Sequence, residues 1–254
     1  MDYNELATVG TQMGCLLIQY GAEIYRAEES MTRLFTAYGA EDSQVFALTT
    51  CINVTVCRPD GVPFTRIRRI NDHCFDLEKI DQLNDLCRRA CTMYIPLWKL
   101  QREMKRIETS RVFSRPVQAL SWAALALTFT LFYGGGPLDA VISAVTGFAV
   151  FGIDRFLSTY RTNLFFLTIL QSAAIGVICL GANHVVPGLH VDVMIIGAVM
   201  NLVPGTAITS FMRDLLAGDY LSGTLRFMES MIVAGAIALG FGIVLFLTRI
   251  LWGV

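Results

Sequence analysis

The distribution of charge along the chain limits the folds that it can adopt. Residues 1–115 hold 15 of the 20 lysine and arginine residues and 15 of the 21 aspartate and glutamate residues. The remaining 139 residues carry only 11 charged side chains, and most of these fall between long apolar runs. Apolar runs of that length are typical of segments that cross a bilayer. We therefore predict a small soluble domain over residues 1–112, followed by a membrane domain over residues 113–254.

The second half is predicted to be an α-helical bundle of five transmembrane helices. A helix rises about 1.5 Å per residue, so about 20 residues cross a hydrocarbon core of about 30 Å. An odd number of spans leaves no room for two equal inverted repeats, which indicates a second subunit or a homo-oligomer. The predicted spans are 116–132, 138–153, 164–186, 191–216 and 227–252.

Basic residues at the ends of these segments predict the orientation of the chain. Nine arginine and lysine residues lie before the first span, between the second and third, and between the fourth and fifth, whereas the opposite side has only Arg249. Short cytoplasmic loops carry the excess of basic residues in membrane proteins. We expect a cytoplasmic N-terminal domain and a C-terminus on the outer side.

The soluble half is predicted to be a small α+β domain. A helical stretch ends at Gly39, which is a natural helix stop. Alternating apolar residues predict strands over 52–56 and 62–70, joined by a turn at 59–61, with 44–50 as a third strand. A helix over 77–93 then precedes a basic connector into the membrane.

The fourth apolar segment contains a helix break. Pro204 cannot donate its backbone amide and clashes with the preceding turn, while Gly205 accepts almost any backbone angle. In hydrocarbon, freed backbone groups are tolerated only where protein, water or a ligand satisfies them. A break of this kind indicates a place where something polar binds or crosses.

The residues around this break suit a small carboxylate-bearing solute. A helix that restarts at Gly205 presents free amides and the positive end of its dipole, which favour a carboxylate. The alternatives are a proline-kinked helix whose hydroxyls bond to its own carbonyls, and Arg213 and Asp214 acting as an anchor and a cap. The predicted substrate-binding residues are Asn201, Pro204, Gly205, Thr206, Thr209, Ser210, Arg213 and Asp214.

A second charged motif lies near the start of the chain. Glu23, Arg26 and Glu29 follow Gly21 at a spacing of three, so they share one helix face and can alternate in ion pairs. One interpretation is a solvated salt-bridge ladder. The other is a charged cluster that faces the cytoplasmic mouth of a pathway.

Polar residues elsewhere in the spans are secondary candidates. Asp139 is expected to cap the second span, with a role at the outer mouth as the alternative. Gln171 and Ser172 are polar at membrane depth, so they are expected to face other helices and are candidates for lining a pathway.

Several functional classes find no support in the sequence. The net charge of −1 gives no reason to predict a nucleic-acid partner. The seven cysteines form no CxxC pair and the histidines number three, so no metal site is expected. The sequence contains no GxxxxGK[ST] pattern, so ATP hydrolysis is not expected. It also shows no Ser/His/Asp or Cys/His arrangement that would predict an enzyme. We predict no cofactor.

With these motifs in hand, the chain resembles the threonine/serine exporter family of bacterial secondary transporters. The resemblance extends over nearly the full length, and its layout is a cytoplasmic domain of about a hundred residues followed by five spans. The late motif is the more specific of the two. The matching residues are Gly21, Glu23, Arg26 and Glu29 near the start, and Val203, Pro204, Gly205, Arg213, Asp214, Gly218, Asp219, Ser222 and Gly223 near the end.

The resemblance implies an exporter in the bacterial inner membrane. Family members occur as long single chains or as split pairs, and this chain resembles the larger partner of the split form, which works with a small hydrophobic membrane protein. It implies export of threonine or serine, or of dicarboxylates such as succinate, with a proton as the expected coupling ion. Ser210 stands where relatives commonly have asparagine, so the substrate is left open. The alternatives are a membrane-bound hydrolase with the N-terminal domain as catalyst, and a regulatory or structural membrane subunit.

Overall fold

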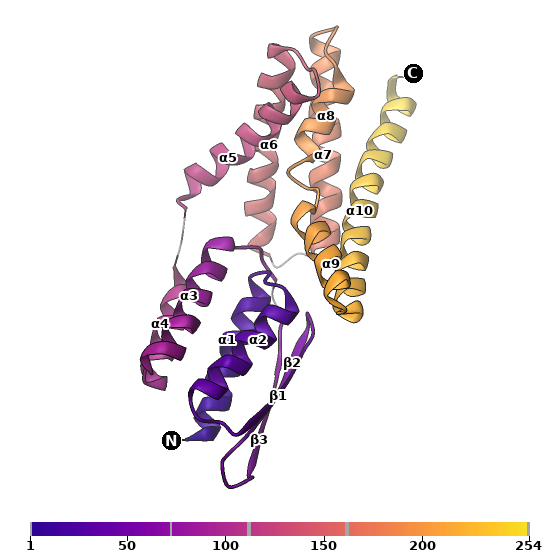
Figure 1. Ribbon diagram of the computed structural model, residues 1–254. Coiled ribbons are helices and arrows are strands. Elements are labelled where there is room, and N and C mark those ends of the chain that lie inside the picture. Colours follow the sequence, from indigo (N-terminus) through magenta and orange to yellow (C-terminus); the bar gives the residue numbers. More distant parts are fainter. Residues whose placement is uncertain (1, 72, 111–112, 161–162, 253–254) are drawn as a thin grey trace. The chain divides into compact units, whose positions relative to one another are not determined.

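A computed structural model describes residues 2–71, 73–110, 113–160 and 163–252 (Figure 1). The chain divides into two compact units. Unit 1 combines Met1–Val112 with Thr206–Phe227, and unit 2 combines Phe113–Gly205 with Met228–Val254. Thr206–Phe227 therefore folds with the N-terminal half of the chain, although it is 94 residues further along than the end of that half.

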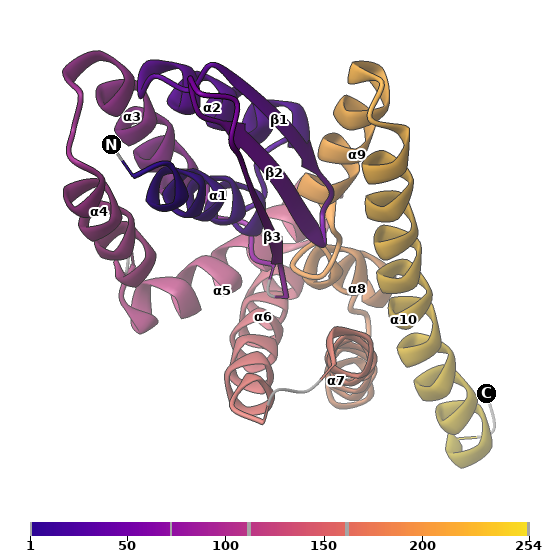
Figure 2. The ribbon, with the colours of Figure 1, turned by 90° about the horizontal axis from the view of Figure 1, so that it is seen from below.

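Unit 1 places an antiparallel sheet against helices. Figures 1 and 2 show α1 and α2 covering one face of the sheet, with the α3–α4 hairpin on the far side of these two helices. The elements of this unit are α1 (Tyr3–Gln19), α2 (Ile24–Ala37), β1 (Asp42–Ala47), β2 (Cys51–Cys57), β3 (Pro63–Arg69), α3 (Leu77–Met93), α4 (Leu97–Thr109) and α9 (Gly205–Ala217), with the start of α10 (Tyr220–Trp252).

The sheet is a meander in the order β1-β2-β3. The central strand β2 buries Ile52, Val54 and Val56 and turns Asn53 outward, as expected for a strand with one face on a core. Val45 lies opposite Val54 in the register with β1. The predicted strands and the helix over 77–93 are thus confirmed, with boundaries within a few residues.

The predicted connector after residue 93 is wrong, because this segment is the helix α4. Leu97, Leu100, Met104 and Ile107 recur at helical spacing and are buried in the core of unit 1. The charged residues between them conceal this apolar face in the sequence. They lie on the exposed side of the helix.

Unit 2 consists of helices with apolar outer faces. In α6, Leu138, Val141, Val145 and Phe148 are exposed, while Val150 is buried in the core that it shares with α7 and α8. Large exposed apolar surfaces are typical of proteins that contact lipid or a partner. The elements are α5 (Arg115–Phe132), α6 (Pro137–Ser158), α7 (Leu164–Val185), α8 (Val191–Val199) and the part of α10 from Met228 onward.

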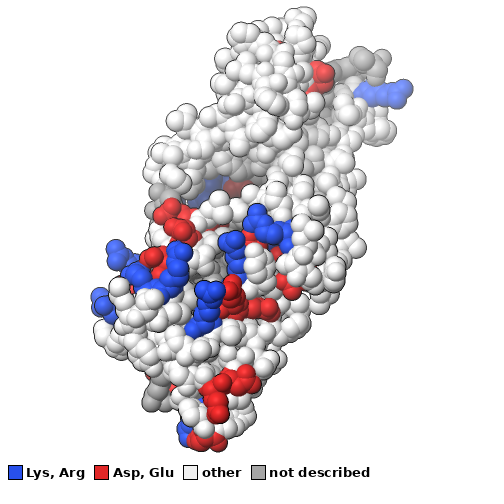
Figure 3. All heavy atoms as spheres, in the orientation of Figure 1, with Lys and Arg blue, Asp and Glu red and all other residues white. Residues whose placement is uncertain are grey.

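Charged side chains are distributed unevenly between the two units. Figure 3 shows lysine, arginine, aspartate and glutamate gathered over unit 1, whereas the visible face of unit 2 carries few of them. This difference agrees with the charge distribution of the sequence.

Within the described part of the chain, helices long and apolar enough to cross a membrane are Pro137–Ser158, Leu164–Val185 and Tyr220–Ile250. These agree with three of the predicted spans. The bundle of five transmembrane helices is not confirmed. The first predicted span, α5, opens with Arg115 and Gln118, which lower its hydropathy. The fourth is divided into α8 and α9, and the nine residues of α8 reach only about 13 Å.

Candidate functional site

The helix break at Pro204 is present. Helix α8 ends at Val199 and α9 begins at Gly205, with a non-helical segment of five residues between them. The amide of Leu202 donates to the carbonyl of Val199, three residues earlier, at 2.7 Å. This is the spacing of a 3₁₀ turn, which is tighter than the i→i−4 spacing of an α-helix. Since proline has no amide to donate, the ladder cannot continue through this segment. The break predicted from the sequence is therefore confirmed.

Helix α9 has an exposed side and a buried side, and the predicted residues divide between them. Thr206, Thr209 and Arg213 are exposed, whereas Ser210 and Asp214 are buried. Thr209 Oγ1 donates to the carbonyl of Thr206 at 2.9 Å, which is the helix-bonded arrangement given above as an alternative. The hydroxyls and Arg213 therefore lie close to one another on α9 but do not share one uniform environment.

The turn between α9 and α10 fixes how these two helices face each other. Gly218 has φ of +93°, a left-handed conformation that favours glycine, and Asp219 N donates to the carbonyl of Asp214 at 2.9 Å. A Cβ at Gly223 would lie 2.8 Å from the side chain of Leu215, so the helices approach closely at that point. The glycines of the late motif thus build a tight helical hairpin.

This hairpin brings a buried arginine onto a buried carboxylate. Arg226 Nε on α10 lies 3.3 Å from Asp214 Oδ2 on α9, and both side chains are at most a tenth exposed. Arg226 Nη2 also donates to the carbonyl of Ala22 at 2.8 Å. The hairpin is therefore bound to the α1–α2 turn of the N-terminal half through a charged group. Arg226 was not identified as a site residue from the sequence, and its only signal there is a cation at the start of an apolar run.

The early motif forms the other side of this arrangement. Gly21, with φ of +94°, turns the chain between α1 and α2 and brings Glu23 to the N-cap position of α2. The carboxylate of Glu23 accepts a hydrogen bond from Arg213 Nη1 and lies 3.6 Å from Arg26 Nε. Glu23 is 10% exposed and Arg213 is 56% exposed, so the pair stands at the edge of the buried region.

The electrostatics of this pair favour the charged form of Glu23. Burial opposes ionisation, but the backbone hydrogen bond and the hydrogen bond from Arg213, with Arg26 nearby, hold the pKa of Glu23 below its ordinary value. The carboxylate is therefore ionised at neutral pH. Two charges of opposite sign are available side by side at this point.

The two motifs that carry the resemblance thus meet in one cluster, defined here as the motif junction: Glu23 and Ala22 on one side, and Arg213, Asp214 and Arg226 on the other. A family model matches residues 8–248, which is most of the chain, and it describes the threonine/serine exporter family ThrE. The chain belongs to the threonine/serine exporter family.

A curated member of this exporter family, the threonine/serine exporter of Corynebacterium glutamicum, is 22% identical over 266 residues. The alignment covers 98% of this chain and 53% of the relative, so the chain spans about half the length of the curated relative that it matches. No solved structure matches the chain. The resemblance predicted from the two motifs is confirmed at the level of the family.

Other residues predicted for this exporter-family chain lie apart from the motif junction. Asn201 donates to the carbonyl oxygens of Trp122 and Ala198, both at 3.3 Å, within unit 2. Glu29 pairs with Arg33 one turn later in α2. The predicted ladder therefore includes the Glu23–Arg26 pair, while Glu29 takes a different partner among the described residues. Pro204 is partly buried and Gly205 is exposed at the start of α9.

No role in the site was predicted for two carboxylates near the junction, Glu28 and Asp219. Glu28 Oε1 accepts a hydrogen bond from the amide of Ala47 at 2.7 Å and so joins α2 to the end of β1. Burial raises the pKa of Glu28 despite this bond, and the negative charge of Asp219 adds to the effect. Asp219 belongs to the late motif, but its position in the sequence does not reveal that it acts on Glu28.

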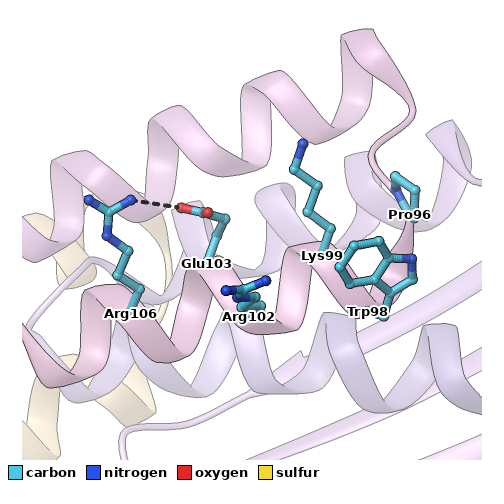
Figure 4. Close-up of a pocket in the computed structure, with 6 residues that line it drawn as sticks. All are labelled: Pro96, Trp98, Lys99, Arg102, Glu103 and Arg106. Atoms are coloured by element: carbon cyan, nitrogen blue, oxygen red, sulfur yellow. Dashed lines mark ion pairs between the residues drawn. The ribbon is translucent and has the colours of Figure 1, made fainter.

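A separate hollow lies on the exposed side of α4. Its volume is about 720 Å³, and Figure 4 shows Trp98 beside Pro96, with Lys99 and Arg102 further along the helix and Arg106 directed toward Glu103 at 3.9 Å. None of the predicted site residues lines it. In the described part of the chain, no group of three or more metal-ligating side chains is assembled.

Proposed function

We propose that this chain forms an exporter of threonine- and serine-type amino acids in the bacterial inner membrane, driven by an ion gradient. Family membership supports an amino-acid exporter. The proposed binding site is inferred from the Glu23–Arg213 pair in the motif junction. An α-amino acid brings one ammonium and one carboxylate. A site that offers a glutamate and an arginine side by side is complementary to both groups.

The proposed recognition step is an exchange of partners. The substrate carboxylate binds the guanidinium of Arg213, which suits bidentate contact with a carboxylate. Its ammonium binds the carboxylate of Glu23. The exposed hydroxyls of Thr206 and Thr209 lie on the same side of α9 as Arg213 and supply hydrogen bonds to the hydroxyl of the solute. Because Arg213 is more than half exposed, the pair can open without unpacking the core.

Dicarboxylates such as succinate are the second substrate class. They match Arg213 equally well, but they have no ammonium to place on Glu23. Amino acids therefore need the carboxylate of Glu23 for binding, whereas dicarboxylates do not. This difference makes the proposed recognition testable.

The arrangement in the membrane is also proposed. Residues 1–112 form the cytoplasmic domain, residues 113–254 form the membrane domain with its C-terminus outside, and the motif junction lies at the cytoplasmic entrance. A small hydrophobic membrane subunit or further copies of the chain are proposed to complete the pathway. A proton is the proposed coupling ion.

The deciding experiment is counterflow of labelled threonine, serine and succinate into proteoliposomes. Three vesicle preparations are compared. The first holds the full chain alone, the second holds the chain with the proposed small hydrophobic subunit, and the third holds that subunit alone. We expect Arg213→Gln to abolish counterflow of all three solutes. Glu23→Gln should lower amino-acid counterflow about tenfold or more, the range for a hydrogen bond to a charged group, and affect succinate less.

A matched control comes from α2 itself. Arg33→Gln removes an exposed arginine that also pairs with a glutamate, so it should leave counterflow unchanged. Undiminished transport by Arg213→Gln would remove Arg213 from the site. If the small subunit alone transports as well as the pair, this chain is a regulatory subunit. If the purified full chain hydrolyses esters or peptides, the alternative of a membrane-bound hydrolase is favoured.

A further inference from the structure

Asp154 is an acidic residue within a helix long and apolar enough to cross a membrane. It lies in α6, four residues before the helix ends at Ser158, and its side chain is half-buried. The predicted second span ends at residue 153, so Asp154 stands at the edge of the membrane segment, and acidic residues in such segments are rare and face other helices or polar paths. A position of this kind requires a reason.

The partner of Asp154 is an amide on the neighbouring helix. Gln171 Nε2 on α7 donates to Asp154 Oδ1 at 3.3 Å, and Gln171 is only 3% exposed. Thr168 and Ser172 flank it on the same buried face, but their hydroxyls bond to carbonyls of their own helix. Gln171 is thus directed across the α6–α7 interface toward the carboxyl group.

A glutamine partner suits a carboxyl group that changes its protonation state. Lysine and arginine are donors only, so they would hold Asp154 as a carboxylate. An amide carries both a donor and an acceptor. It can donate to the carboxylate and can accept from the protonated carboxylic acid. The Asp154–Gln171 pair therefore accommodates both states with the same two side chains.

The ionisable residues around Asp154 come from its own helix and from the helices that pack against it. The charged group acting on it is Arg155, the next residue, whose side chain is exposed. Helices α5, α7 and α8 pack against α6. Their described ionisable residues include Arg115 at the start of α5, His184 near the end of α7 and Asp192 in the first turn of α8. Asp139, at the other end of α6, binds Gly136 and His190.

We propose that Asp154 binds and releases the coupling ion, a proton, during transport. On one side of the membrane an O–H bond of a hydronium ion breaks as an O–H bond forms at the carboxylate, which leaves water and the carboxylic acid. On the other side that O–H bond breaks, the proton forms an O–H bond with water to give hydronium, and the carboxylate is restored. The inference rests on the proposed function, because it assigns the coupling step of that exporter to one residue outside the motif junction.

The first test separates exchange from gradient-driven transport. In proteoliposomes, counterflow needs no proton movement, whereas accumulation driven by a pH gradient does. Asp154→Asn should keep counterflow within about twofold of the wild type and lower gradient-driven accumulation at least tenfold. Glu229→Gln, an exposed carboxyl group on α10, is the matched control and should change neither rate.

The second test does not depend on transport. Infrared difference spectra of the purified full chain, recorded between acid and neutral pH, should contain a protonated-carboxyl band that Asp154→Asn removes and Gln171→Leu shifts in pH. Absence of such a band would overturn the assignment, as would gradient-driven accumulation by Asp154→Asn at the wild-type rate. If Asp154→Asn loses both counterflow and accumulation, the Asp154–Gln171 pair has a structural role and the assignment is overturned. If the wild type itself shows no counterflow, the proposed function fails and the spectra still decide the titration.

Discussion

The guanidinium of Arg213 donates a hydrogen bond to the carboxylate of Glu23, a residue 190 positions earlier in the chain. This contact joins the two motifs by which the chain resembles its family. Behind it, the buried Arg226 binds both Asp214 and the carbonyl of Ala22. The exposed pair is suited to exchange partners with a solute, while the buried one holds the helical hairpin against the N-terminal half.

This division predicts different costs for removing the two arginines. Arg226→Met leaves Asp214 as a buried charge without its cation, which costs about 3 kcal/mol or more of unfolding free energy. Arg213→Gln removes a cation that is more than half exposed, so solvent screening limits the cost to about 1 kcal/mol or less. Unfolding in detergent, followed by tryptophan fluorescence, measures both. Equal costs for the two variants would contradict the division.

The hairpin between α9 and α10 should be sensitive to its glycine. Gly223→Ala places a Cβ 2.8 Å from the side chain of Leu215 and 3.2 Å from the carbonyl of Phe211. We expect a loss of about 1–3 kcal/mol, as in other overpacked contacts. Gly235→Ala on the same helix is the control, because nothing lies within 4 Å of a Cβ there. The unfolding midpoints of the two variants in detergent should differ, and matching midpoints would show that the hairpin does not pack tightly at Gly223.

Features set by local backbone chemistry were predictable from the sequence. Pro204 removes an amide donor whatever surrounds it, so the helix break could be identified without the fold. Asp76 caps α3 by accepting from the amide of Lys79, so a local signal marks the start of the predicted helix over 77–93. Asp139 likewise accepts from the amide of Gly136 and confirms the predicted cap of α6.

Features set by long-range packing were not predictable. The partner of Arg213 depends on how the α9–α10 hairpin folds against the α1–α2 turn, and no spacing in the sequence encodes that contact. Helix α4 was missed because its apolar residues alternate with charges. Arg226 lies at the start of an apolar run, where a membrane anchor is the simpler interpretation. In each case the deciding information is a contact between distant segments.

The cysteines should differ sharply in reactivity. Burial raises the pKa of Cys15 to about 11 and that of Cys87 to about 12, so both are protonated thiols at neutral pH and shielded from reagents. Cys74 is exposed. Mass spectrometry after brief N-ethylmaleimide treatment should detect labelled Cys74 in the folded chain, with Cys15 and Cys87 labelled only after denaturation. Early labelling of Cys15 or Cys87 would show that unit 1 opens readily.

Glu28 should make stability depend on pH in a defined direction. Its pKa is raised by burial and by Asp219, so the folded chain binds this proton more tightly than the unfolded chain does. The associated stability is fully present below the ordinary glutamate pKa and is lost as the pH rises through the raised value. Glu28→Gln keeps an acceptor for the amide of Ala47 and removes the charge. It should therefore raise the unfolding midpoint at pH 7, and the difference from the wild type should shrink toward pH 4. Asp42→Asn on the exposed end of β1 provides the control. A difference that grows toward acid pH would reverse the sign and show that the carboxylate of Glu28 stabilises the fold.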